Sequence, residues 1–65
     1  MNREVDRITP RQLAERWGMT EPSLAQWRYL RKGPDYIRAG RKILYPLSSV
    51  LDFERQNTVK CSGAA

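Results

Sequence analysis

Two helix start signals flank a single glycine early in the chain, and their spacing restricts the possible folds more than any other feature. Thr9, Pro10 and Gln12 supply an N-cap, a proline at the first helical position and a capping box. Gly18 suits the left-handed residue that ends a helix, and Thr20 can cap the next one. Two short helices joined by so tight a turn predict a helix-turn-helix unit.

The second helix is expected within the stretch Met19 to Lys32, and its two faces differ. At helical spacing Leu24, Trp27, Leu30 and the stem of Arg31 share one side, which suits a hydrophobic core. The other side is small, polar and able to hydrogen-bond, as a surface that meets base edges in a DNA major groove must be. The DNA-binding residues predicted on this recognition helix are Glu21, Pro22, Ser23, Ala25, Gln26, Arg28 and Tyr29.

The chemistry of each polar side chain on this helix favours a different role. Gln26 is the first candidate for base readout because its amide can form two hydrogen bonds with adenine, although a surface glutamine is more often only solvated. Ser23 and Arg28 suit phosphate contacts, with helix capping an equal alternative for Ser23. Tyr29 would contact a phosphate or pack under the following hairpin. Glu21 would accept a hydrogen bond from cytosine or, more often, complement the helix dipole.

A β-hairpin is expected after the second helix. Strand-like residues 36–38 and 43–45 flank a turn in which Gly40 can supply the positive φ of a tight hairpin. The tip of this hairpin would project as a basic wing. Arg41 would enter a narrow minor groove, while Arg38 and Lys42 would contact the DNA backbone.

A third helix completes the expected domain. Ser48 or Ser49 would cap it, and Phe53 would pack against both tryptophans, for which core packing is favoured over stacking on bases. The predicted class is mainly α with a small β-hairpin, a winged helix-turn-helix in the order α-α-β-β-α. The chain is expected to divide into a flexible lead-in (1–7), the DNA-binding domain (8–57) and a disordered tail (58–65). The predicted core residues are Leu13, Trp17, Leu24, Trp27, Ile43 and Phe53.

Positive charge is concentrated beside the predicted recognition helix. The chain has a net charge of +5, and residues 28–42 alone carry six cations against Asp35. The charges of the remaining residues add up to zero. Such a concentration favours a polyanion over a merely solvated surface. A membrane surface is the weaker alternative, because no segment is a basic amphipathic helix with a broad apolar face.

The residue inventory argues against an enzyme and against a metal site or another cofactor. The 65 residues include no histidine and one cysteine, Cys61, so neither a cysteine-based zinc site nor an internal disulfide is expected. No glycine-rich phosphate loop occurs, and the carboxylates lie on separate elements. No apolar run approaches the roughly 20 residues that span a bilayer, and no signal peptide precedes the domain. The chain is therefore expected in the cytoplasm, without a small-molecule substrate.

Three short motifs resemble those of a known family of small DNA-binding proteins. S-L-A-Q-W, then A-G-R-K-I-L-Y and then S-S-V-L-D-F are similar to the phage excisionases and the AlpA-like small regulators of the MerR-like winged-helix superfamily. The resemblance covers roughly residues 8–55. Ser23 stands where the family opens its recognition helix, Leu24 and Trp27 where it has a buried pair, and Gly40 with Arg41 where it has the wing turn.

The resemblance implies a recombination directionality factor without catalytic activity. Such a protein binds several adjacent sites in double-stranded DNA of a phage attachment region, bends that DNA, contacts the phage integrase and favours prophage excision in the bacterial host cell. Weak head-to-tail contacts between copies on DNA are also implied. Lambda-type excisionases have an acid and an arginine at the positions of Pro22 and Gln26, so a different target sequence is expected.

Two other functions remain open from the sequence. The first is a small AlpA-like transcriptional regulator of a mobile element with the same fold. The excisionase is preferred because the chain ends soon after the third helix and so has little room for an effector domain. The second is a protein-interaction adaptor that does not bind DNA and whose basic charge only keeps it soluble.

Overall fold

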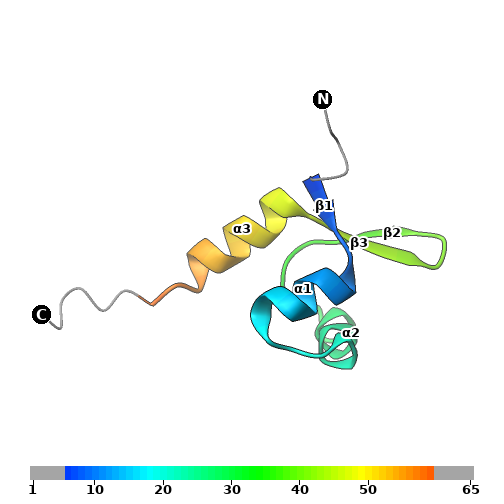
Figure 1. Cartoon of the computed structure of the whole chain (residues 1–65), viewed down its shortest axis with the longest axis horizontal. Coiled ribbons are helices and arrows are strands. Elements are labelled where there is room, and N and C mark those ends of the chain that lie inside the picture. The colour runs from blue at the N-terminus through cyan, green and yellow to red at the C-terminus, as the bar shows by residue number, and fades with distance from the viewer. Residues whose placement is uncertain (1–5, 60–65) are drawn as a thin grey trace, which may run out of the picture.

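The computed structural model describes residues 6–59, which form three helices and a three-stranded antiparallel sheet (Figure 1). The elements are β1 (Arg7–Ile8), α1 (Pro10–Trp17), α2 (Glu21–Tyr29), β2 (Ile37–Ala39), β3 (Lys42–Pro46) and α3 (Leu47–Gln56). The fold is therefore a small mixed α/β arrangement that begins with a strand. This corrects the predicted order α-α-β-β-α, whereas the predicted hairpin is present as β2 and β3 and gains a third strand.

The additional strand lies across the predicted boundary between the flexible lead-in, which ended at Arg7, and the domain, which began at Ile8. The strand order is β1-β3-β2, and Arg7 and Ile8 pair with Pro46 and Tyr45 at the end of β3. A two-residue strand has no alternating pattern of its own, so the sequence could not indicate it. It pairs with the edge of β3 opposite to β2, beyond residues 42–44 that pair with β2. Residues 1–5 of the lead-in lie outside the described residues.

The boundaries of α1 agree with the sequence prediction. The Thr9 hydroxyl accepts from the backbone N–H of Gln12 at 3.1 Å, and the Gln12 side chain accepts from the backbone N–H of Thr9 at 2.9 Å. At the other end Gly18 has φ +67°, and the backbone N–H of Met19 donates to the carbonyl of Ala14. The capping box and the left-handed glycine thus confine α1 to eight residues.

The second helix is shorter than predicted. It ends at Tyr29, and Arg31 has φ +59°, outside the helical region. Leu30, expected in the core, is 52% exposed, and Arg31 is exposed as well. The helix ends in the hydrogen bonds from the backbone N–H groups of Arg31 and Lys32 to the carbonyls of Arg28 and Trp27, and Gly33 with φ +94° and Pro34 prevent it from continuing further. The last turn predicted for this helix is therefore loop.

The third helix starts earlier than predicted and without the expected serine cap. Its N-cap position is Pro46, which makes no capping hydrogen bond, so β3 runs directly into α3. Ser48 and Ser49 lie inside the first turn. At the other end the hydroxyl of Thr58 donates to the carbonyl of Glu54. The predicted tail otherwise falls mainly on residues 60–65, which lie outside the described residues.

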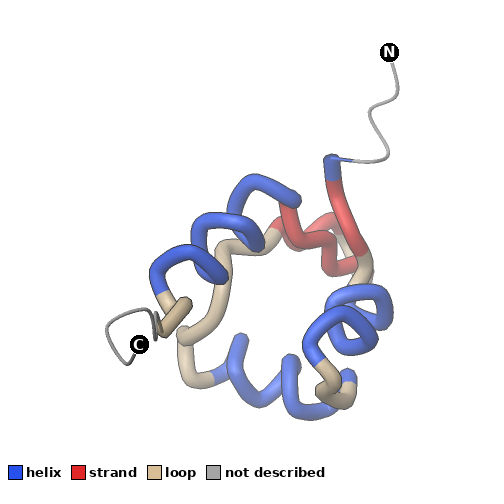
Figure 2. Tube along the Cα trace, turned by 60° about the vertical axis from the view of Figure 1, so that its left-hand side comes forward, coloured by secondary structure: helices blue, strands red, loops and turns tan. Residues whose placement is uncertain are grey.

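The core lies where the three helices and the sheet meet (Figure 2). Of the predicted core residues, Leu13 and Leu24 are fully buried, while Trp17, Trp27 and Ile43 are partly buried and pack against the core. The core centre also includes residues that the sequence analysis did not select. The fully or almost fully buried side chains are Leu13, Ala14, Leu24, Tyr45 and Val50.

An aromatic cluster joins the three helices at one side of this core. The ring centroids of Trp17 and Trp27 are 6.1 Å apart, and Phe53 lies 5.4 Å from Trp17 and 5.9 Å from Trp27. These tilted contacts are typical of favourable aromatic pairs. The predicted packing of Phe53 against both tryptophans is confirmed.

Candidate nucleic-acid interface

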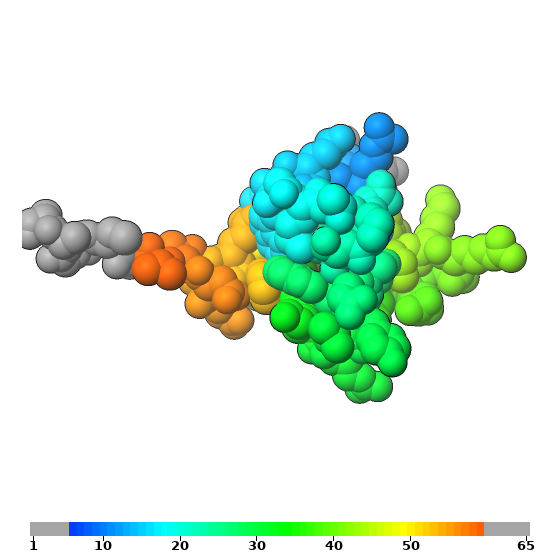
Figure 3. Space-filling view, turned by 90° about the horizontal axis from the view of Figure 1, so that it is seen from below, coloured from blue at the N-terminus to red at the C-terminus, as the bar shows by residue number. Residues whose placement is uncertain are grey.

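The first half of α2 and the β2–β3 hairpin face each other across an open groove of about 670 Å³. Viewed from below, α2 lies in the middle of the exposed surface and the hairpin projects beside it (Figure 3). The groove thus brings predicted helix residues and predicted wing residues to one side of the molecule. Its lining residues are Thr9, Pro10, Glu21, Pro22, Ala25, Arg28, Arg41, Lys42, Ile43 and Leu44.

Three of the predicted recognition residues, Ser23, Gln26 and Tyr29, do not line this groove. Gln26 is exposed on α2 but does not line the groove. Tyr29 is 83% exposed, which excludes the expected alternative of packing under the hairpin. Both side chains are therefore open to an incoming ligand, on the part of α2 that continues away from the wing.

Ser23 takes part in capping α2. Its backbone N–H donates to the Thr20 hydroxyl at 3.2 Å, and its hydroxyl accepts from the Thr20 hydroxyl at 2.9 Å. The Ser23 hydroxyl keeps its own proton to donate, so one phosphate oxygen can still be bound from this position. The capping alternative is thus realised, and it orients the Ser23 side chain at the start of the helix.

Arg28 is held within the protein rather than projecting from its flank. Its guanidinium donates to the hydroxyl of Tyr45 at 2.7 Å and lies 5.7 Å from the centroid of the Tyr36 ring. Tyr45 is 1% exposed, so this hydrogen bond connects α2 to the interior of the sheet. Arginine has five N–H donors, and those not used here can face the groove that Arg28 also lines.

The wing carries cations without partners among residues 6–59. Gly40 has φ +63°, as the tight turn requires, and Arg38, Arg41 and Lys42 are all exposed. The three ion pairs recorded in that part of the chain use residues of α1 and α3 only. The positive charge of the hairpin is therefore available to a polyanion.

Glu21 is the carboxylate that lines the groove. It lies in the first turn of α2, where a negative charge complements the helix dipole. A phosphate would be repelled by this side chain, whereas an amino group on a base edge would be attracted. At this position in the groove, Glu21 would therefore favour contact with base edges over contact with the phosphate backbone of DNA.

The sequence analysis did not select Arg31 and Lys32, two cations near the end of α2, as site residues. Arg31 and Lys32 line a second open hollow with Arg28 and Tyr29. Arg31 was placed on the core side of a longer helix, and only the early end of α2 exposes it. The concentration of positive charge in residues 28–42 could have indicated from the sequence that both belong to the site.

Residues 6–59 contain no group of three or more side chains that could hold a metal ion, and none of their helices is long and apolar enough to cross a bilayer. Comparison with protein-family models, with curated proteins and with solved structures finds no match to this chain.

Proposed function

We propose that this protein is a winged-helix DNA-binding protein that acts as an excisionase. It binds and bends double-stranded DNA and directs integrase-mediated recombination toward excision of a prophage. The observation that carries the proposal is the shared groove, in which Pro22 and Ala25 of α2 face Arg41 and Lys42 of the hairpin. A duplex can be contacted by both elements at once only if they lie on the same side, as they do.

In this proposal α2 enters the major groove and the wing enters the adjacent minor groove. Gln26 reads a base edge, while Pro22 and Ala25 make apolar contacts such as those with a thymine methyl group. Arg41 is inserted into the minor groove, where a narrow groove has an enhanced negative potential. Simultaneous contact with two neighbouring grooves favours a duplex bent around the protein.

The DNA-binding step is tested with alanine variants and charge-matched controls. Arg41→Ala and Gln26→Ala should each weaken binding to the cognate duplex, whereas binding to mixed-sequence DNA should fall mainly in Arg41→Ala. Arg55→Ala and Gln56→Ala remove the same groups from exposed positions on α3 and should bind like the wild type. Wild-type protein that binds no duplex at low salt would refute the proposal and leave the adaptor alternative.

The role in recombination rests on the three motifs that resemble excisionases. It is tested by excision in vitro with the integrase encoded beside this chain, on DNA that carries several adjacent binding sites. The proposed partners are that integrase and further copies of the chain arranged head to tail on the DNA. Stimulation of excision supports the proposal. DNA binding without any stimulation would instead support a transcriptional regulator of the same mobile element.

A further inference from the structure

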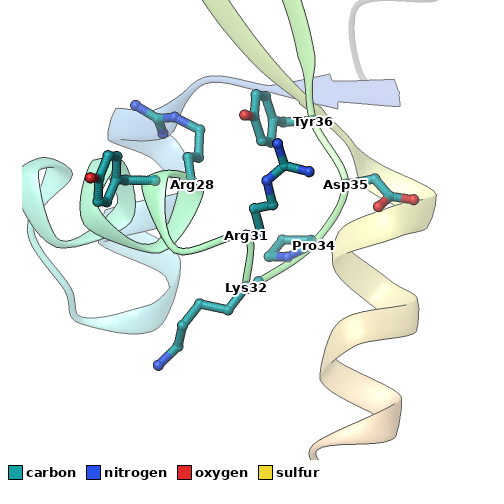
Figure 4. A pocket seen from close by; sticks show the side chains of 8 residues that line it. Arg28, Arg31, Lys32, Pro34, Asp35 and Tyr36 are labelled. Atoms are coloured by element: carbon teal, nitrogen blue, oxygen red, sulfur yellow. The ribbon is translucent and has the colours of Figure 1, made fainter.

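The hollow at the C-terminal end of α2 has the composition of an anion site. It is lined by the last turn of α2 and the loop that leads to β2, and three cations, Arg28, Arg31 and Lys32, contribute to it. Asp35 is its only carboxylate, and Figure 4 shows that side chain beyond the loop, toward α3. Arg31 extends between Pro34 and Tyr36, on the side where Arg28 lies (Figure 4).

Arg31 occupies a position that normally belongs to glycine. The backbone N–H of Lys32 donates to the carbonyl of Trp27 and that of Arg31 donates to the carbonyl of Arg28, which together form a Schellman motif. The end of α1 has the same pattern of hydrogen bonds, and there the left-handed residue is Gly18. Within residues 6–59, Arg31 is the one non-glycine residue with positive φ.

The Schellman hydrogen bonds are made by the backbone and do not require an arginine at this position. The Arg31 side chain is exposed and forms neither a recorded ion pair nor a recorded side-chain hydrogen bond among residues 6–59. Residues held in sparsely populated backbone conformations cluster at functional sites. An arginine in this place is therefore better explained by a ligand than by the stability of the fold.

The hollow and the groove both lie along α2 and share one lining residue. Arg28 lines both, with Glu21, Pro22 and Ala25 toward the wing and Arg31 and Lys32 toward the other end. The nine residues of α2 extend about 13 Å, close to the roughly 12 Å width of the major groove. A helix lying across that groove would bring its C-terminal end to the second strand. Cations are needed there, because the C-terminal end of a helix repels phosphate.

We infer that this hollow binds a backbone phosphate of the same duplex, on the strand opposite the wing, with Arg31 as its main contact. The inference rests on the proposed function and adds a third point of contact to the helix and the wing. The ammonium group of Lys32 lies 5.6 Å from the ring centroid of Trp27, an attractive arrangement of a cation and an aromatic ring.

The substitution Arg31→Gly separates this role from a structural one. Glycine relieves the strain, so the midpoint of urea denaturation should rise or stay unchanged. Affinity for a short mixed-sequence duplex, followed by fluorescence anisotropy, should nevertheless fall on the order of fivefold near 100 mM salt. The slope of log K against log salt should become shallower by about 0.9, the value for one phosphate contact.

Three further variants make the result decisive. Asparagine tolerates the left-handed region but has no charge, so Arg31→Asn should reproduce the loss of affinity. Lysine retains the positive charge, so Arg31→Lys should show most of the wild-type salt slope. Arg55→Ala loses one exposed positive charge from α3 and should leave affinity and slope unchanged.

The outcomes distinguish the inference from the proposal on which it rests. If the wild type binds duplex and Arg31→Gly binds with the same affinity and slope, the hollow is no phosphate site and its cations only complement the end of the helix. If Arg55→Ala weakens binding as much as Arg31→Gly does, total charge explains the effect and the inference is wrong. A wild type that binds no duplex refutes the proposed function itself.

Discussion

The carboxylate of Glu54 on α3 forms a bidentate ion pair with the guanidinium of Arg16 on α1, with N–O distances of 2.6 and 2.9 Å. It also accepts a hydrogen bond from the indole N–H of Trp17 at 2.6 Å. The hydrogen bonds from Arg16 and then from Trp17 favour the charged carboxylate and lower the pKa of Glu54 from 4.5 to about 2. This pair connects the first and last helices beside the aromatic cluster.

The lowered pKa predicts a pH-dependent contribution to stability. Since the pKa of Glu54 is lower in the folded than in the unfolded chain, the contribution is complete above pH 4.5 and is lost as the pH falls toward 2. Glu54→Gln should therefore lower the melting temperature by a few degrees at pH 7, and the difference from wild type should vanish near pH 2. Glu15→Gln, whose contact with Arg11 is 3.9 Å and exposed, is the control and should change little. A constant difference at all pH values would contradict the assignment.

Two glycines with positive φ should differ in their tolerance of alanine. At Gly18 a Cβ atom would meet nothing within 4 Å, so Gly18→Ala should cost only the left-handed strain, about 1 kcal/mol. At Gly33 a Cβ atom would lie 2.9 Å from Cε3 of Trp27, so Gly33→Ala should cost about 2–3 kcal/mol because the aromatic cluster must also shift. Urea denaturation measures both free energies of unfolding. Equal losses of unfolding free energy in the two variants would show that the Trp27 ring can move aside freely.

Trp27 is expected to be a structural residue. Trp27→Ala removes a half-buried ring that contacts Trp17 and Phe53 and should lower the free energy of unfolding by about 3 kcal/mol. Tyr29→Ala, two residues further along α2 and 83% exposed, should change it by less than about 0.5 kcal/mol. A Trp27→Ala variant that keeps its stability and loses only DNA affinity would place this ring at the DNA surface.

The hydrogen bond between Arg28 and Tyr45 should contribute to stability independently of DNA. Tyr45→Phe retains the buried ring but removes the acceptor for the half-buried guanidinium, so the free energy of unfolding should fall by about 1 kcal/mol. The double variant Tyr45→Phe with Arg28→Ala provides the control, because a thermodynamic cycle isolates the pair. Additive effects of the two substitutions would show that the hydrogen bond contributes nothing.

Local signals in the sequence determined much of this fold. Thr9, Gln12 and Gly18 set both ends of α1 through contacts with neighbours in the chain, and Gly40 indicated the hairpin turn. The spacing of Leu24 and Trp27 correctly placed the inward face of α2. Each of these features depends on residues a few positions apart, which is why the sequence alone predicts it.

Contacts between distant segments decided the rest. The strand formed by Arg7 and Ile8 exists only because β3 offers an open edge, and the burial of Tyr45 and Val50 depends on how the sheet meets the helices. The meeting of α2 and the wing tip across one groove likewise follows from packing. So does the exposure of Arg31, since α2 ends at Tyr29 and not at Lys32 as the pattern predicted. A pattern of side chains specifies which face is apolar, whereas the three-dimensional packing specifies which faces come together.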